Sequence, residues 1–176
     1  MKRIHKPKVQ KERFFDSKEN IIKVCAAAAV VVLLVVVLMI VESGYGKIVI
    51  KNKTNLKLEY VKTSYVGPES VTAEGIETSA IEVNKTFSQK LEPVNLSYTS
   101  SNLEIHFKFE NQEELFTDVG FFNDKFDGNV TISFENTDDP NLITMKVKAK
   151  NGIFKTRSID CDEEYTIDLS EGGIYQ

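Results

Sequence analysis

An apolar run of 18 residues, Val24–Val41, is the feature of this chain that most restricts its fold. The run contains no charged side chain, and as an α-helix it would be about 27 Å long, close to the roughly 30 Å hydrocarbon core of a bilayer. A helix buried in a globular domain would have one polar face, and this run has none. We therefore predict one transmembrane helix at Val24–Val41, with the lipid bilayer as its partner.

Charge differs sharply between the two sides of this run. Residues 1–23 contain eight lysines and arginines against three carboxylates, whereas residues 24–176 contain 14 against 23. Because Lys and Arg close to a membrane helix stay in the cytoplasm, we expect residues 1–23 to be a basic cytoplasmic tail of a cell-membrane protein. Residues 42–46 would then be a linker and residues 47–176 an extracytoplasmic domain. A cleaved signal peptide is the alternative, although its apolar region usually has only about 7–15 residues.

The acidic balance of residues 24–176 argues against one large class of partners. A nucleic-acid-binding protein needs a clustered basic surface, so we predict no nucleic-acid partner. The sequence also contains no Gly-rich phosphate loop, no zinc-ligand spacing and no nucleophile-elbow motif. We therefore predict no cofactor and no metal.

Beyond the linker, apolar and polar residues alternate with a period of two, which is typical of half-buried β-strands. The clearest case is 103–109, where apolar residues alternate with Glu, His and Lys. Similar patterns predict strands at 47–51, 56–60, 130–134, 143–149 and 165–169, and weaker patterns predict them at 79–87, 94–98 and 115–122. We therefore expect residues 47–176 to be an all-β domain, and among such folds we favour an antiparallel β-sandwich, Ig-like in architecture, over a barrel.

A second pattern in this domain is the dipeptide Asn151-Gly152, which favours a tight hairpin turn. A two-residue turn would place Lys148 opposite Lys155 and Lys146 opposite Arg157. Five cations would then share one face, and we predict that they bind a partner: Lys146, Lys148, Lys150, Lys155 and Arg157. The partner would be an envelope protein or an acidic polymer. The alternative is that these lysines protect an exposed strand from sheet-to-sheet aggregation.

Cys161 and His106 are the only Cys and His after the apolar run. A basic tail, a membrane anchor and a β domain with His upstream of Cys is a layout that resembles the sortases, which are anchored β-barrel transpeptidases using Cys, His and Arg. The family's Thr-Leu-x-Thr-Cys is replaced here by Arg-Ser-Ile-Asp-Cys at 157–161, and no Arg follows Cys161. Acidic neighbours at 160–164 also disfavour the thiolate that a nucleophile needs.

Acidic loops are the remaining candidates for chemistry. Calcium takes six to eight oxygen ligands, which a cluster such as 160–164 could partly supply, but no EF-hand spacing occurs. We therefore expect a non-enzymatic, membrane-anchored binding or accessory module for an envelope protein complex or polymer. An anchored Cys/His transpeptidase and a calcium-dependent adhesion module are the alternatives.

Overall fold

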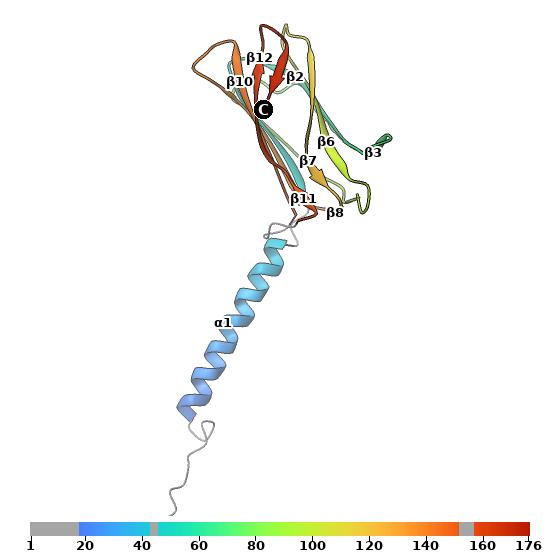
Figure 1. The fold of residues 1–176 in the computed structure, drawn as a ribbon. Coiled ribbons are helices and arrows are strands. Elements are labelled where there is room, and N and C mark those ends of the chain that lie inside the picture. Colours follow the sequence, from blue (N-terminus) through green and yellow to red (C-terminus); the bar gives the residue numbers. More distant parts are fainter. Residues whose placement is uncertain (1–17, 43–45, 152–156) are drawn as a thin grey trace, which may run out of the picture. The chain divides into compact units, whose positions relative to one another are not determined.

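The structure is a computed structural model that describes residues 18–42, 46–151 and 157–176. The chain divides into two compact units, of which one holds a helix and the other holds all the strands (Figure 1). Helix α1 spans Lys18–Glu42 and is long and apolar enough to cross a membrane. It contains the predicted apolar run and starts before it, in a polar turn where Lys23 forms an ion pair with Glu19.

The second unit is a β domain, which begins at Gly46 in the described part of the chain. Its described strands are β1 (Lys47–Lys53), β2 (Leu58–Val66), β3 (Val71–Glu77), β4 (Thr86–Lys90), β5 (Val94–Asn95), β6 (Ser101–Phe109), β7 (Glu114–Phe122), β8 (Lys125–Phe126), β9 (Asn129–Asn136), β10 (Leu142–Lys150), β11 (Ile159–Asp160), β12 (Asp162–Asp168) and β13 (Gly173–Tyr175). The prediction of a β-rich domain is confirmed.

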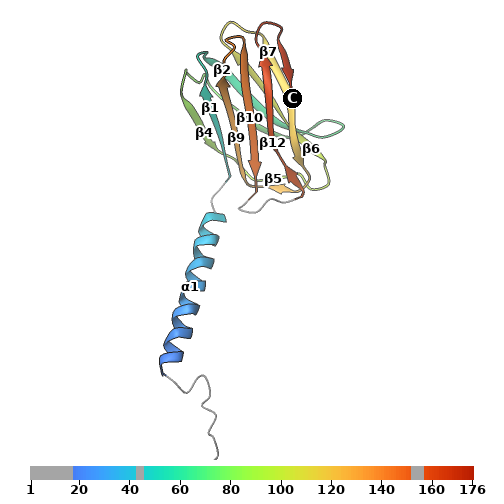
Figure 2. The same ribbon diagram turned by 60° about the vertical axis from the view of Figure 1, so that its left-hand side comes forward.

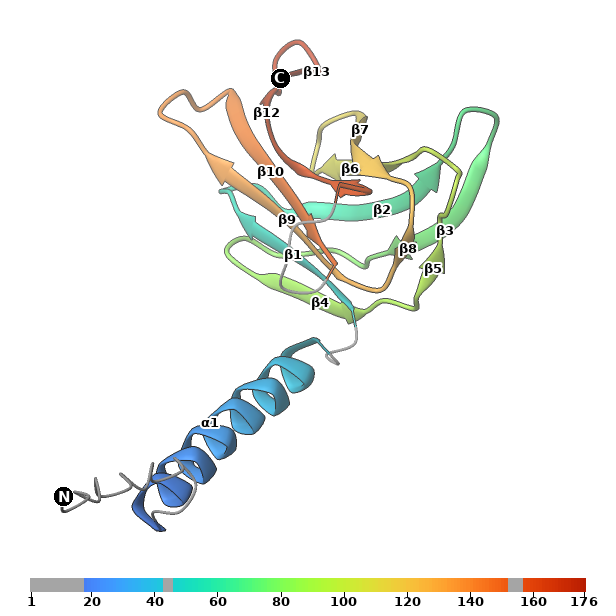
Figure 3. The ribbon, with the colours of Figure 1, turned by 60° about the horizontal axis from the view of Figure 1, so that its bottom comes forward.

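Most of these strands belong to two large sheets. One sheet has six strands in the order β13-β12-β10-β9-β1-β4, and the other has five in the order β11-β7-β6-β2-β3. Strands β5 and β8 form a separate short pair. Figure 2 shows β4, β1, β9 and β10 side by side in one layer, and Figure 3 shows β7, β6, β2 and β3 in the other. The described strands form no closed barrel.

One pairing in the six-stranded sheet is parallel. Ile48 of β1 lies opposite Val130 of β9, and Ile50 lies opposite Ile132, with both strands running in the same direction. The other pairings are antiparallel among the described strands. The prediction of a wholly antiparallel domain is therefore wrong at this position, because residues 54–128 separate these partners and bring β9 back beside β1 in the same direction.

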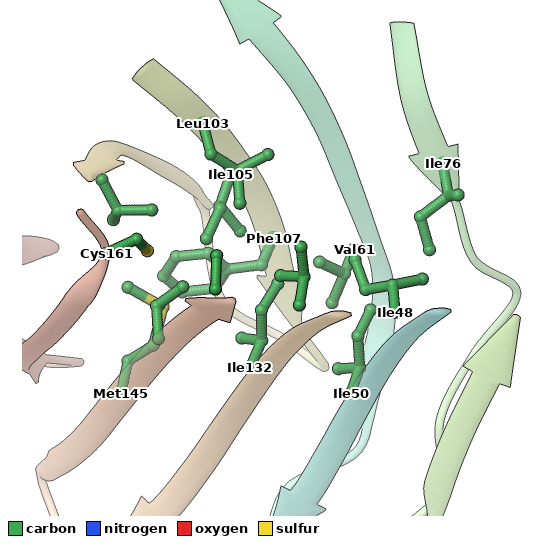
Figure 4. Packing of buried hydrophobic residues seen from close by; sticks show 14 of the residues in the cluster. Ile48, Ile50, Val61, Ile76, Leu103, Ile105, Phe107, Ile132, Met145 and Cys161 are labelled. Atoms are coloured by element: carbon green, nitrogen blue, oxygen red, sulfur yellow. The ribbon is translucent and has the colours of Figure 1, made fainter. Parts of the chain in front are cut away.

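The alternation seen in the sequence becomes alternation of burial. In β6 the apolar residues are at most 1% exposed, whereas the polar residues between them are half-buried and point away from the core. The ring of Phe107 in β6 lies 5.1 Å from the ring of Phe134 in β9, so the inner faces of both large sheets meet in one hydrophobic cluster (Figure 4). Each fully buried large apolar side chain contributes about 1.5–3 kcal/mol to folding.

Strands β2 and β3 depart from the sequence prediction. Strand β2 continues to Val66 although only 56–60 was expected to be extended, and β3 was not expected at all. In β2, the buried hydroxyls of Thr63 and Ser64 interrupt the apolar alternation. In β3, only Ile76 is buried, so the strand has no apolar alternation to detect. Thr63 is buried, and its hydroxyl accepts a hydrogen bond from the backbone N–H of Ile76 at 3.0 Å, beside an irregularity in the β2–β3 register.

A buried amide holds the end of β1 to the turn that follows. The side-chain nitrogen of Asn52, which is fully buried, donates to the carbonyls of Leu56 at 2.8 Å and Ile81 at 3.1 Å. Its side-chain oxygen accepts from the backbone N–H of Thr54 at 3.1 Å and from the Thr54 hydroxyl at 2.8 Å. This one side chain therefore satisfies several buried polar groups.

We expect Asn52→Ala to lower the free energy of unfolding by about 2–3 kcal/mol, because it leaves buried donors and acceptors without partners. The measurement is chemical denaturation of the full-length protein in detergent, followed by circular dichroism. Asn55→Ala is the matched control in the same turn: Asn55 is exposed, so its loss should change stability by less than about 0.5 kcal/mol. Equal stability of the two variants would contradict the role given to Asn52.

Candidate functional site

Three of the predicted partner-binding cations lie on the outer face of β10. Lys146, Lys148 and Lys150 alternate with side chains such as Met145 and Val147, which are fully buried in the core. Because successive side chains of a strand point to opposite faces, the lysines project from the side of the six-stranded sheet that faces away from the core. The three lysines therefore share one face of β10, as the alternation of the sequence predicted.

The neighbouring strands add further lysines to the same face. In register, Lys146 lies opposite Ser133 of β9, which lies opposite Lys51 of β1. At the end of the sheet, Lys150 lies opposite Asn129, the side chain of which accepts a hydrogen bond from the backbone N–H of Lys47. We call this surface the lysine face; its members are Lys47, Lys51, Lys53, Lys90, Lys146, Lys148 and Lys150.

Sequence reasoning missed four members of this surface. The three lysines of β1 and Lys90 of β4 were not among the predicted partner-binding residues. Lys90 joins because β4 pairs with β1 and brings it directly opposite Lys47. Only the parallel β1–β9 pairing brings β1 and β4 into the same sheet as β10, and local sequence patterns carry no signal for such a pairing.

The lysine face concentrates positive charge on an acidic domain. It contains seven of the 14 basic residues that follow Val24. Three carboxylates lie directly opposite lysines of this face on neighbouring strands. Glu135 of β9 lies opposite Lys53, and Asp162 and Glu164 of β12 lie opposite Lys148 and Lys146. The face is therefore basic overall, while residues 24–176 carry an excess of acidic groups.

Some of these lysines form ion pairs within the face. Lys148 lies 2.9 Å from Asp162, and Lys146 lies 3.5 Å from Glu164. Glu135 lies 2.6 Å from Lys53, and its pKa is lowered chiefly by the hydrogen bond from this ammonium group. Such exposed pairs contribute only about 0–1 kcal/mol. A multivalent anion can therefore compete with them at little cost.

Lys47, Lys51 and Lys150 differ from these paired lysines. Within the described ranges, no carboxylate lies within 4.0 Å of their ammonium groups. An external anion at these positions has no neighbouring carboxylate of the face to displace. These three positions are the ones at which an external anion would gain the most.

The predicted hairpin at Asn151-Gly152 is wrong. Strand β10 pairs with β12, so that Glu164 lies opposite Lys146, where Arg157 was expected, and Asp162 lies opposite Lys148, where Lys155 was expected. Residues 159–160 form β11 and join the five-stranded sheet instead. Arg157 is exposed just before β11, and Lys155 lies outside the described residues. The register therefore brings opposite charges together and avoids the repulsion that the predicted hairpin would have imposed.

Cys161 and His106 are not brought together. Cys161 is 4% exposed within the core, and burial, assisted by the charge of Glu163, raises the pKa of its thiol to about 12 (Figure 4). His106 projects from the outer face of β6, between Glu104 at 3.0 Å and Glu114 at 2.9 Å. The buried side chains of β6 lie between these two groups, so neither is in position to activate the other.

The imidazole of His106 is held by its acidic neighbours. Burial alone would lower the pKa of His106, but hydrogen bonds to Glu104 and Glu114 outweigh burial and raise it. The same bond to His106 is the chief reason that the pKa of Glu114 is lowered. The exposed ring of Phe116 stacks on the imidazole, with centroids 5.2 Å apart. This arrangement is a surface ion-pair cluster that favours the protonated histidine.

Comparisons of the chain with models of protein families, with curated proteins and with solved structures found no match. Among residues 18–42, 46–151 and 157–176, no three His, Cys, Asp or Glu side chains form a group that could hold a metal ion. The candidate function therefore rests on the geometry and charge of the lysine face.

We expect Cys161 to react with an alkylating reagent at neutral pH on the order of 100-fold more slowly than a free peptide thiol, because it is buried and protonated. The measurement is the labelling rate of the full-length Cys25→Ser protein in detergent, which leaves Cys161 as the single thiol. His106→Ala should leave this rate unchanged. Rapid labelling that depends on His106 would instead favour the transpeptidase alternative.

We expect the stability of the protein to fall as the pH rises above about 6.5, by less than about 1 kcal/mol, through His106. A raised pKa in the folded state means that the protonated imidazole stabilises the fold below the unfolded pKa, and that this contribution is lost as the pH rises through the folded pKa. The free energy of unfolding of His106→Gln, measured by denaturation over the same pH range, should not show this loss. Glu104→Gln with Glu114→Gln should abolish this loss or reverse its sign, because burial alone would lower the pKa of His106. An unchanged profile in all variants would contradict the assignment.

Proposed function

We propose that this protein is a single-pass, membrane-anchored and non-enzymatic binding module of the cell envelope, which uses its lysine face to hold an anionic partner. The partner is an acidic polymer or an acidic surface of an envelope protein complex. The observation that carries this proposal is the concentration of seven lysines on one sheet face of an otherwise acidic domain.

The charge distribution supports binding over a purely protective role. Lysines that protect against aggregation are needed on edge strands. Six of the seven lysines of the lysine face lie on β1 and β10, which are interior strands, and only Lys90 lies on an edge strand, β4. Lysines on the flat face of interior strands do nothing to block edge pairing. A polyanion laid across this face would contact several strands at once.

Membrane attachment is the second part of the proposal. Helix α1 has the length and composition of a membrane span, and none of its membrane-length window is buried within the described structure. The excess of Lys and Arg before the helix favours a cytoplasmic N-terminus. We therefore propose that the β domain is extracytoplasmic.

The third part concerns architecture. We propose that the six-stranded and five-stranded sheets form a β-sandwich of Ig-like architecture. The contact between Phe107 and Phe134 and the shared hydrophobic cluster support this proposal. A sandwich has two outward faces, which leaves the lysine face available to a partner over its whole width.

We expect the full-length protein in uncharged detergent to bind poly-L-glutamate, and we expect Lys51→Gln, Lys146→Gln and Lys148→Gln together to weaken this binding by about tenfold. Binding should also weaken steeply with added salt, because exposed charges are screened over a Debye length of about 8–10 Å. Fluorescence anisotropy of labelled poly-L-glutamate measures both effects.

A matched variant controls for the loss of charge itself. Lys57→Gln, Lys62→Gln and Lys85→Gln remove the same number of lysines from outside the lysine face, and binding should then change less than about twofold. Equal losses in the two triple variants would mean that net charge, and not the lysine face, governs binding. Undetectable binding of the unaltered protein, together with no envelope partner crosslinked to it in its own membranes, would refute the proposal.

A further inference from the structure

One end of the β domain is defined by the point at which the chain enters it. Gly46 follows Glu42, the last residue of α1, by four residues in the sequence. The carbonyl of Gly46 accepts a hydrogen bond from the backbone N–H of Leu91 at 2.8 Å, and Gly46 lies against the carbonyl oxygen of Gly128. We call this region the chain-entry end.

A row of lysines crosses the six-stranded sheet at this end. Lys90 lies opposite Lys47, and Asn129 lies between Lys47 and Lys150. This row is the part of the lysine face closest to Gly46 along the strands. Like charges directly opposite one another oppose folding, so an anion in front of the row would relieve the repulsion between Lys47 and Lys90.

An exposed aromatic ring lies in the loop that follows β5 at the same end. Tyr98 is 95% exposed. Strand β5 pairs with β8. Asn151, the residue that follows β10, donates a hydrogen bond from its side chain to the carbonyl of Lys125 in β8 at 2.8 Å. The loop carrying Tyr98 therefore belongs to the same end as Lys150 and Gly46.

The conformation of this loop is fixed, and Tyr98 is held outward by it. Tyr98 has a φ of 66°, in the left-handed region that non-glycine residues seldom adopt. Leu96 on one side is fully buried, and its carbonyl accepts from the backbone and the hydroxyl of Thr99 at 3.2 and 2.8 Å. A strained backbone that is held by its surroundings to present a large ring to solvent indicates a contact made by that ring.

Acidic side chains at this end have partners of their own. One oxygen of Asp127 lies 3.1 Å from the ammonium of Lys125. Asp124 accepts hydrogen bonds from the backbone N–H of Lys125 at 2.7 Å and from the Ser158 hydroxyl at 3.2 Å. These two carboxylates have local partners on the surface of the domain, so they oppose an external anion less than free carboxylates would. Glu92, which follows Leu91 at the same end, is exposed and reduces the positive charge there.

We propose that the chain-entry end is a membrane-docking surface, on which Tyr98 enters the interfacial region of an anionic bilayer while Lys47, Lys90 and Lys150 contact lipid phosphates. This inference rests on the membrane anchor of the proposed function. Tyrosine favours the boundary between headgroups and acyl chains because it has an apolar ring and a polar hydroxyl. Lysines near an anionic surface add an attraction that salt weakens, and the anchor supplies a high local concentration of lipid.

The chain contains no tryptophan, so Tyr98→Trp creates a single fluorescent reporter at the proposed contact. The full-length variant is reconstituted into phosphatidylcholine vesicles containing phosphatidylglycerol and lipids brominated near the headgroup. Phe116→Trp is the matched control, because Phe116 is also an exposed ring but lies on β7 in the five-stranded sheet. We expect the Tyr98→Trp variant to be blue-shifted and quenched at least about twofold more than the Phe116→Trp variant.

Charge variants test the lysine row in the same experiment. Lys47→Gln with Lys90→Gln, added to Tyr98→Trp, should reduce quenching toward the level of Phe116→Trp, whereas Lys62→Gln with Lys85→Gln should not. Phosphatidylcholine vesicles without the anionic lipid should likewise give less quenching. Equal quenching of the two tryptophan variants in anionic vesicles would overturn the proposal, and indifference to the Lys47 and Lys90 changes would overturn the role of the lysines.

Flotation of the same vesicles in high salt measures whether the protein is anchored in the membrane, independently of the docking surface. It therefore separates a failure of this inference from a failure of the proposed function. Protein that fails to float has no membrane anchor, and both proposals are then wrong. If the Tyr98→Trp variant floats but its fluorescence is unquenched, the anchor stands and only the docking surface is refuted. Circular dichroism spectra equal to that of the unaltered protein would confirm that each variant is folded.

Discussion

The parallel pairing of β1 with β9 is the constraint on which the rest of the β domain depends. It inserts β1 between β4 and β9, so that the lysines of β1 and β4 share one sheet face with those of β10. It also sends Ile48 and Ile50 into the core opposite Val130 and Ile132. One long-range contact thus completes the hydrophobic cluster and assembles the lysine face.

The two sheets carry opposite charge on their outer faces. On the five-stranded sheet, Glu104 lies opposite Asp118, and the pKa of Asp118 is raised by burial and by the charge of Glu104. On the six-stranded sheet, Lys47 lies opposite Lys90. Each like-charge pair costs some tenths of a kcal/mol. The apolar cluster offsets these costs easily, because every fully buried ring or branched side chain contributes more than one such pair removes.

The sequence predicted the interior strands well and their partners poorly. Alternation over 103–109 and 143–149 located β6 and β10 because each has one face in the core and one in water, which is a local property. Asn151-Gly152 was misleading, because a favourable turn dipeptide does not determine which strand pairs with β10. There, the attraction of Lys148 for Asp162 and the burial of Tyr165 and Ile167 favour β12. The four lysines of β1 and β4 were missed because they join the lysine face only through the pairing of β1 with β9. Residues 54–128 separate these two strands, and no local pattern encodes such a pairing.

The burial of Cys161 has a consequence for where this protein can mature. The only other cysteine, Cys25, lies within the apolar run of α1, so the β domain has no second thiol with which to form an internal crosslink. Its stability comes chiefly from the hydrophobic cluster, in which the Cys161 side chain is one more small apolar group. Unlike many small secreted domains, it requires no oxidising compartment and no disulfide isomerase to reach its native state. Its folding is therefore indifferent to the redox poise of the compartment in which it folds.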